Sequence, residues 1–180
     1  MANDTQWPRF QVFVQEKHGS PFLDYGSVHA PDPEMALLNA RDVFARRPEC
    51  VAMWVVPAQG IFSKTAQELA DWQSMPSPHN VSTPEPYHVF AKSKSVGTQT
   101  QIGQVEASSP EGALLLALDR FRKTTTAFAW WVFPAQLVLS SQVQDIPSLY
   151  APAGEKTFRL STDYKTVTAM RQLLGKSSEE

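Results

Sequence analysis

The first part of the chain has the hydrophobic pattern of a β-hairpin. Residues 10–16 alternate between apolar and polar positions, with Phe10 and Val12 on the apolar side. Successive side chains of a strand point to opposite faces, so this alternation predicts a half-buried strand. Residues 19–21 (Gly-Ser-Pro) predict a turn, and a second strand is expected around 24–30.

A helix is predicted directly after the hairpin. Asp32 suits the N-cap, Pro33 needs no amide partner at the first helical position, and Glu34 complements the positive end of the helix dipole. The predicted inward-facing residues recur at a spacing of four and are Ala36, Ala40 and Phe44.

Residues 51–57 (VAMWVVP) are apolar at every position up to the proline. A strand with one face in solvent would alternate, so this run predicts a strand that is covered on both faces. The resulting ββαβ unit is expected to form a three-stranded antiparallel sheet. Its strands follow the order second, first, third, and the helix covers one face.

The chain contains this pattern twice. A shift of 77 positions aligns residues 7–64 with 84–141 without a gap, and 21 of these 58 positions are identical. The helix segment PEMALLNARDVF (33–44) falls on PEGALLLALDRF (110–121). Gapless identity over this length indicates an internal duplication.

Each unit needs a partner surface. Phe13, Trp54, Phe90 and Trp131 lie in strands that show apolar groups on the face opposite the helix. A unit of roughly 60 residues buries only about 60% of its unfolded surface, so it is marginally stable alone. We therefore predict an α+β protein of two tandem ββαβ units, paired as a pseudo-twofold dimer within one chain.

The predicted organisation has four parts. Repeat 1 covers 7–64, a linker rich in Pro, Ser and Asn covers 65–83, repeat 2 covers 84–141, and an extended tail with the C-terminal end covers 142–180.

Composition narrows the class of protein. A net charge of −2 shows no excess of basic residues of the kind that nucleic-acid binding proteins have. A single cysteine, Cys50, excludes an intramolecular disulfide and favours the cytoplasm. The N-terminal residues lack the pattern of a secretory signal, and no apolar run is long enough for a membrane span, so we expect a cytoplasmic protein without membrane contact.

Three motifs of repeat 1 carry a family resemblance: WPRFQVFV (7–14), GSVHAPDPEMALLNARDVFARR (26–47) and MWVVPA (53–58). They resemble the B-subunit family of ring-1,2-phenylacetyl-CoA epoxidase, also called phenylacetic acid degradation B (PaaB). The tail that the family carries is matched after the second repeat, at Tyr150, Pro152, Ala153, Lys156, Phe158, Arg159 and Tyr164. The resemblance implies a single unit per chain, so the tandem form departs from the family pattern.

The resemblance implies a role in a multicomponent oxygenase acting on an aryl-CoA thioester. In that system another subunit holds the di-iron site, a related subunit is structural, and a flavin/iron–sulfur reductase supplies electrons. The family's own small protein carries no cofactor and bridges the catalytic heterodimers. Contact with the reductase is left open.

The residues themselves predict no catalytic, cofactor or metal site. The only Glu-x-x-His, at 85–88, contains a proline and opens a strand, where residues three apart point to opposite faces. The four histidines have no metal-ligand spacing. Cys50 is replaced by Ala127 in the second copy, which favours a buried or edge thiol over a nucleophile.

We therefore expect a non-catalytic bridging subunit of a di-iron oxygenase, with that enzyme's catalytic and structural subunits as partners. The alternatives are a stand-alone module that binds an acyl-CoA or similar ligand between the repeats, and an enzyme in its own right. His29, Asn39 and Arg41 become Glu106, Leu116 and Leu118 in the second copy, which predicts a one-sided contact surface. The full set of predicted interface residues is Trp7, Phe13, His29, Asn39, Arg41, Trp54, Trp130, Trp131, Arg159 and Tyr164.

Overall fold

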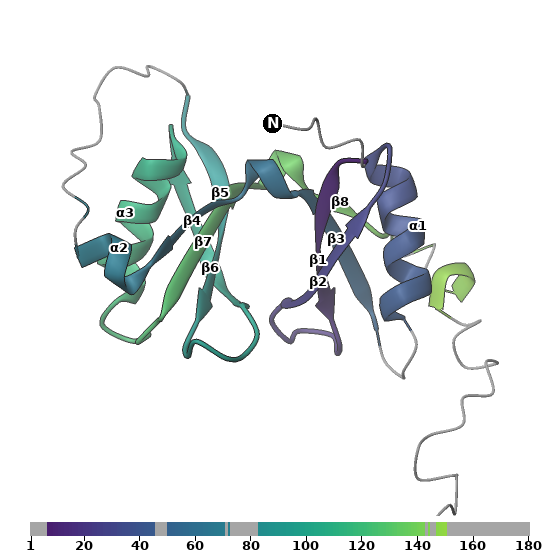
Figure 1. The fold of residues 1–180 in the computed structure, drawn as a ribbon, viewed down its shortest axis with the longest axis horizontal. Coiled ribbons are helices and arrows are strands. Elements are labelled where there is room, and N and C mark those ends of the chain that lie inside the picture. Colours follow the sequence, from purple (N-terminus) through teal and green to yellow (C-terminus); the bar gives the residue numbers. More distant parts are fainter. Residues whose placement is uncertain are drawn as a thin grey trace, which may run out of the picture.

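The computed structural model describes residues 7–45, 50–70, 72, 83–142, 144 and 147–150. The first half begins with four elements in chain order (Figure 1): β1 (Arg9–Gln15), β2 (Leu23–His29), α1 (Pro33–Phe44) and β3 (Ala52–Pro57). Strand β1 pairs antiparallel with β2 on one side and with β3 on the other.

The second half repeats these elements 77 positions later as β5 (Glu85–Lys92), β6 (Thr100–Ala107), α3 (Pro110–Phe121) and β7 (Ala129–Pro134). Strand β5 lies between β6 and β7, and all three are antiparallel. Even the irregularities recur, because the register shifts after Val12 in β1 and after Val89 in β5.

Both long helices begin as the sequence predicts. The Asp32 carboxylate accepts a hydrogen bond from the Met35 amide at 2.7 Å, and the Ser109 hydroxyl accepts one from the Gly112 amide at 3.1 Å. Each cap satisfies an amide that has no partner within the helix. Proline follows each cap as the first helical residue.

Two glycines recur because a phenylalanine ring lies on each of them. A Cβ on Gly26 would lie 3.4 Å from Cζ of Phe44, and one on Gly103 would lie 2.6 Å from Cζ of Phe121. Gly26 also has a φ of +119°, which disfavours a side chain. Glycine in the second strand therefore lets the last residue of each helix pack onto the sheet.

Two short strands exchange between the halves. A 3₁₀ turn, η1 (Ala58–Gly60), leads from β3 to β4 (Phe62–Thr65), and β4 pairs with β7 of the second half. In the same way η2 (Ala135–Leu137) leads from β7 to β8 (Leu139–Ser140), which pairs with β3 of the first half. Each half thus supplies one strand to the other.

The exchange produces one sheet. Its eight strands have the order β4-β7-β5-β6-β2-β1-β3-β8. The predicted α+β class with antiparallel strands is confirmed. The expectation of three strands in each unit was incomplete, because each unit contributes a fourth, short strand to one shared sheet. Strands β4 and β8 were not predicted, and the residues predicted as linker 65–83 include the short helix α2 (Ala66–Ala70).

The two halves also meet at the middle of this sheet. Leu23 of β2 pairs with Thr100 of β6. On either side of that pair, the Asp24 amide donates to the Gln99 carbonyl and the Gln101 amide donates to the Phe22 carbonyl, both at 2.9 Å. The sheet is therefore continuous through backbone hydrogen bonds.

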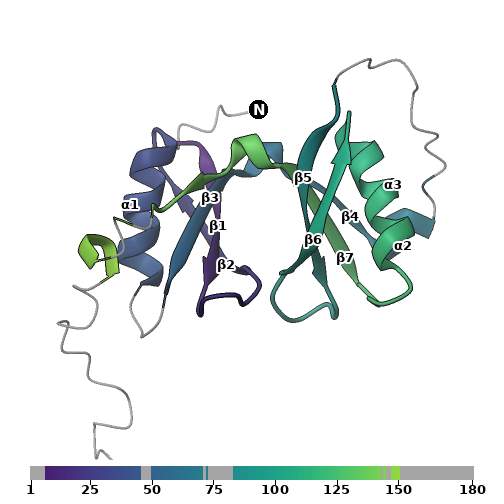
Figure 2. The same ribbon diagram turned by 180° about the vertical axis from the view of Figure 1, so that it is seen from behind.

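Three apolar clusters form the core. One lies between α1 and its strands and a second between α3 and its strands. The third lies between the halves and is built from Phe13, Phe22, Val56, Phe90 and Phe133. Figures 1 and 2 show the strands of the two halves facing each other with α1 and α3 on the outside. The second copy thus covers the sheet face that the helix leaves open.

Phe13 is at the centre of the cluster between the halves. It has no exposed surface, and its ring centroid lies 4.4 Å from that of Phe90 and 5.2 Å from that of Phe133.

Within the described ranges no helix is long and apolar enough to cross a membrane.

Removing the Phe13 ring tests whether this cluster stabilises the whole chain. We expect Phe13→Ala to lower the free energy of unfolding by about 3–5 kcal/mol, because it leaves a cavity between the halves. Urea unfolding followed by circular dichroism measures the change. Phe128→Ala is the control, since Phe128 is 44% exposed, and a loss of about 1 kcal/mol or less is expected for it. Equal losses in the two variants would contradict the role of the cluster.

Candidate partner-binding surface

Three of the predicted interface residues form a connected group at the start of the first half. The Trp7 carbonyl oxygen lies 2.8 Å from Nδ1 of His29, and the Asn39 amide donates to the His29 carbonyl at 3.2 Å. These contacts join the N-terminal segment, β2 and α1. Trp7 is 59% exposed and His29 is also exposed, so the group is accessible to a partner.

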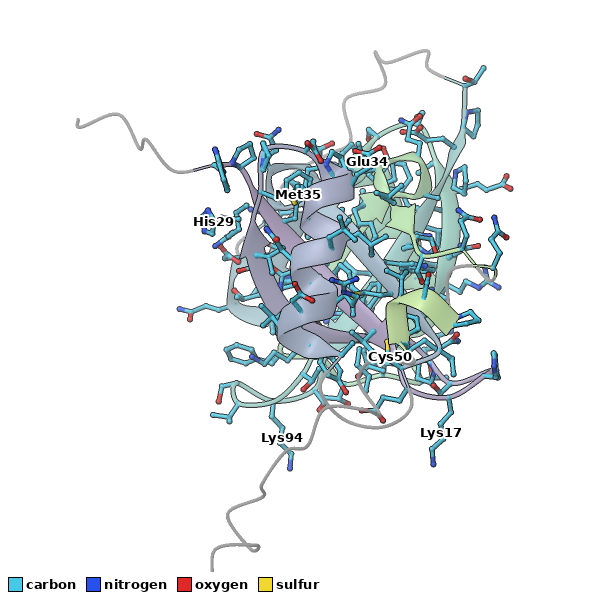
Figure 3. All side chains as sticks on the ribbon, turned by 90° about the vertical axis from the view of Figure 1, so that its right-hand side faces the viewer. Lys17, His29, Glu34, Met35, Cys50 and Lys94 are labelled. Atoms are coloured by element: carbon cyan, nitrogen blue, oxygen red, sulfur yellow. The ribbon has the colours of Figure 1, made fainter. Side chains whose placement is uncertain are left out.

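The outward side of α1 extends this surface. Met35 and Leu38 are 42% and 41% exposed, which is high for large apolar side chains in a helix that also packs on a sheet. Figure 3 shows Met35 and His29 near the end where α1 begins, with Cys50 at the opposite end. Exposed apolar side chains beside polar ones are typical of protein contact sites.

Arg41 lies on the other edge of this surface. At 100° per residue, positions 39 and 41 of a helix are separated by about 200°, so Asn39 and Arg41 flank the exposed side of α1. The Arg41 guanidinium forms an ion pair with the neighbouring Asp42 carboxylate at 2.8 Å. The predicted polar residues therefore border an exposed side that carries Met35 and Leu38 together with the acidic Glu34 and Asp42, rather than forming one cluster. We call Trp7, His29, Met35, Leu38, Asn39 and Arg41 the α1 surface.

The α1 surface belongs to the first copy alone. Five of its six residues differ in the second copy, the exception being Leu38, which remains leucine as Leu115. Trp7 becomes Pro84, Met35 becomes Gly112, and the three polar residues become Glu106, Leu116 and Leu118. The two copies thus present different outer faces on the same fold.

The remaining predicted aromatic anchors lie inside the protein. Phe13 is fully buried, and Trp130 is 2% exposed against α3. Trp54 and Trp131 are half-buried beside the cluster between the halves, and the Trp54 ring stacks on Phe22 with centroids 3.6 Å apart. The prediction that Phe13 and Trp130 are surface anchors was wrong, because the chain's own halves and helices cover them.

Two predicted interface residues, Arg159 and Tyr164, lie outside the described residues. Their role stays a prediction from the family resemblance.

His88 is a buried histidine whose setting the sequence did not indicate. Its Nδ1 accepts hydrogen bonds from the side-chain amides of Gln101 at 3.2 Å and Gln104 at 3.1 Å. Trp54 of the first half and Phe133 pack on its ring, with centroids 4.5 and 5.6 Å away. Burial lowers the pKa of His88 to about 4, so the imidazole is neutral near pH 7. In the first copy this position is Gln11.

Cys50 is a half-buried thiol, as the sequence predicts. Its Sγ lies 3.6 Å from the Ala52 carbonyl oxygen, and it packs against the cluster under α1 together with Tyr150. Burial raises the pKa of the Cys50 thiol to about 11. The thiol is therefore protonated at neutral pH, and a protonated thiol is a poor nucleophile.

No three His, Cys, Asp or Glu side chains lie close enough to hold a metal ion within the described segments. In the Glu85–His88 motif, Glu85 accepts a hydrogen bond from the Tyr87 hydroxyl at 3.1 Å, whereas His88 faces the other half. The two side chains thus serve separate contacts.

Comparison with known proteins shows that both copies match the same family. Residues 6–78 and 84–171 each match the family described as phenylacetic acid degradation B. A relative from Escherichia coli (strain K12), described as the B subunit of 1,2-phenylacetyl-CoA epoxidase, is 40% identical over 70 residues. These residues are 39% of this chain and 74% of the relative. No solved structure matches the chain.

The His88 environment predicts a pH dependence of stability. In the unfolded chain the imidazole binds a proton near pH 6.5, whereas in the folded chain it does so only near pH 4. Stability should therefore fall as the pH drops from about 6.5 to about 4, with a slope of at most ~1.4 kcal/mol per pH unit for one proton.

His88→Gln introduces the residue that the first copy has at this position, and it should flatten this part of the curve. Urea unfolding at intervals between pH 7 and pH 4 measures both proteins. Parallel curves for the variant and the parent would show that His88 does not cause the pH dependence.

Proposed function

The chain belongs to the phenylacetic acid degradation B family, and we propose that it is a non-catalytic accessory subunit of a multicomponent oxygenase of the phenylacetyl-CoA epoxidase type. The observation that carries the proposal is the family match of both copies, at residues 6–78 and 84–171. The E. coli relative is itself described as a subunit of such an epoxidase.

We further propose that this chain corresponds to a dimer of single-unit family proteins joined into one polypeptide. The 70 matched residues already make up 74% of the E. coli relative, so that protein has room for one repeat and not for two. The reciprocal pairing of β4 with β7 and of β8 with β3 supports this view, because each half completes the sheet of the other. The proposed boundaries are repeat 1 at 7–64, linker at 65–83, repeat 2 at 84–141 and tail at 142–180.

The proposed partners are the di-iron catalytic subunit of the oxygenase and its structural companion. The α1 surface is the proposed contact, because it combines exposed apolar residues with polar ones and is missing from the second copy. A fused pair with unlike outer faces can bind a partner on one side without binding an identical copy on the other. Such a chain would bridge its partners asymmetrically.

The alternative is a stand-alone module that binds an acyl-CoA between the repeats. It has less support, because the inner faces of the halves pack on each other through Phe13, Phe90 and Phe133. A ligand there would have to displace a packed aromatic cluster.

Affinity purification of the tagged full-length chain from its source cells, read by mass spectrometry, tests the proposed function. We expect stoichiometric recovery of a subunit that carries the Glu-x-x-His signature of a di-iron carboxylate protein, together with a related subunit. Recovery of the chain without such a subunit would contradict the accessory role.

The α1 surface is tested by the double variant His29→Ala and Arg41→Ala. Each side chain is at the protein surface, so we expect at least tenfold weaker binding of the oxygenase subunits with an unchanged unfolding midpoint. The matched control is Glu106→Ala with Asp119→Ala, which removes two exposed polar residues of the second copy. Biolayer interferometry with the purified partner measures both variants, and equal affinities would exclude the α1 surface as the contact.

A further inference from the structure

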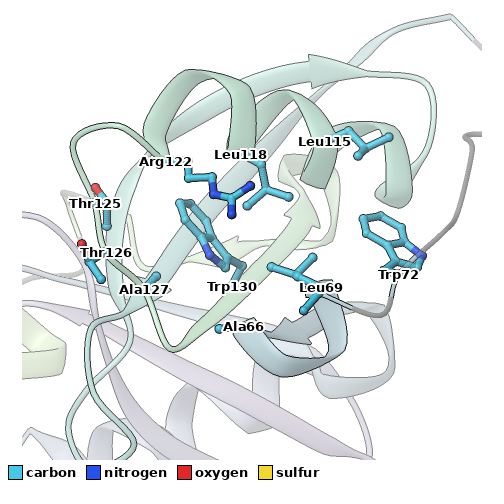
Figure 4. A pocket seen from close by; sticks show the side chains of 11 residues that line it. Ala66, Leu69, Trp72, Leu115, Leu118, Arg122, Thr125, Thr126, Ala127 and Trp130 are labelled. Carbon is cyan, nitrogen blue, oxygen red and sulfur yellow. The ribbon is translucent and has the colours of Figure 1, made fainter.

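The second half carries a pocket that the proposed function does not use. It lies between α2, α3 and the start of β7, with a volume of about 470 Å³ (Figure 4). This volume falls within the range of small-molecule sites, about 300–1,000 Å³.

The strand exchange brings the two walls of this pocket together. One wall is α2, which follows β4 and lies in the segment between the repeats, and the opposite wall is α3 of the second repeat. The Ala66 amide donates to the Phe128 carbonyl at 2.7 Å, which ties the start of α2 to the loop before β7. The pocket thus depends on the pairing of β4 with β7.

Local hydrogen bonds hold both walls in place. Thr65 and Glu68 cap α2 reciprocally: the Thr65 amide donates to the Glu68 carboxylate at 2.7 Å, and the Glu68 amide donates to the Thr65 hydroxyl at 3.2 Å. After α3, the Thr125 amide donates to the Phe121 carbonyl at 2.9 Å. A preformed site loses less conformational entropy when a ligand binds.

The lining combines apolar side chains with one cation. Leu69, Trp72 and Leu118 supply the apolar surface over Trp130, which is 2% exposed, and Figure 4 shows the Arg122 guanidinium beside Leu118. Arg122 forms no ion pair with the part of the chain that the structure describes. An arginine in this position offers paired donors to a carboxylate.

The first copy lacks this combination. Arg122 corresponds to Ala45, Leu118 to Arg41 and Trp130 to Met53. On that side Tyr150 packs against the core under α1, and its hydroxyl donates to Ser141 at 3.0 Å. The positive charge and the aromatic floor therefore occur together in the second half only.

We propose that this pocket binds a small monocarboxylate with an aromatic or branched apolar body. The apolar body lies on Leu69 and Leu118, and the carboxylate is held by the Arg122 guanidinium. A single arginine among the lining residues favours one negative charge over the multiple charges of a phosphate ester. This site is separate from the α1 surface and does not depend on the accessory role.

Titration of the full-length chain with phenylacetate, followed through the indole N–H signals of Trp72 and Trp130 by NMR, tests the proposal. We expect saturable shifts of these signals. Phenylacetamide has nearly the same shape without the charge, so it should bind at least tenfold more weakly. Equal affinity for the amide, or no saturable shift with phenylacetate, would overturn the proposal.

Two variants and one control complete the experiment. Arg122→Ala should weaken phenylacetate binding at least tenfold, and Leu118→Glu, which places a carboxylate beside the Arg122 guanidinium, should abolish it. Lys123→Ala removes the next cation along the chain, which does not line this pocket, and should leave the affinity unchanged. Full affinity in Arg122→Ala, or an equal loss in Lys123→Ala, would refute the carboxylate contact. Binding of phenylacetyl-CoA without binding of phenylacetate would also refute it.

Discussion

The structure depends on the reciprocal exchange of two short strands. Strand β4 follows the first repeat but pairs with β7 of the second, and β8 follows the second repeat but pairs with β3 of the first. A strand of two to four residues buries too little surface to be stable without neighbours. Each half is therefore complete only when the other is folded beside it, and the aromatic cluster around Phe13 fills the space between them.

This arrangement lets the two copies diverge on the outside. Residues that build the fold recur in both copies, as Gly26 and Gly103 do beneath a phenylalanine ring. The outer residues differ: the first copy presents the exposed α1 surface, and the second has a pocket beside Arg122. A homodimer of single units would carry the same two surfaces twice. Fusion allows the two outer faces to differ on the same fold.

Much of the fold follows from local pattern. Alternation at residues 10–16, the Asp-Pro-Glu helix start and the apolar run at 51–57 predict elements within a residue or two of those observed. Strands β4 and β8 were missed because each is too short for its apolar and polar residues to show an alternating pattern. Their partner strands also lie more than 60 positions away in the sequence. Covering of the Phe13 face by the second copy was expected from the apolar strand faces, but burial of Trp130 beneath α3 was not, so the sequence alone left Trp130 as a candidate interface anchor. The pocket was missed because its walls come from segments far apart in the sequence.

Differential scanning calorimetry of the full-length chain tests most directly whether the two repeats form one cooperative unit. Strand exchange and the shared aromatic cluster predict a single transition in which the calorimetric and van't Hoff enthalpies agree. Two separate transitions, or a van't Hoff enthalpy near half of the calorimetric value, would show that the repeats unfold independently and would contradict a shared core.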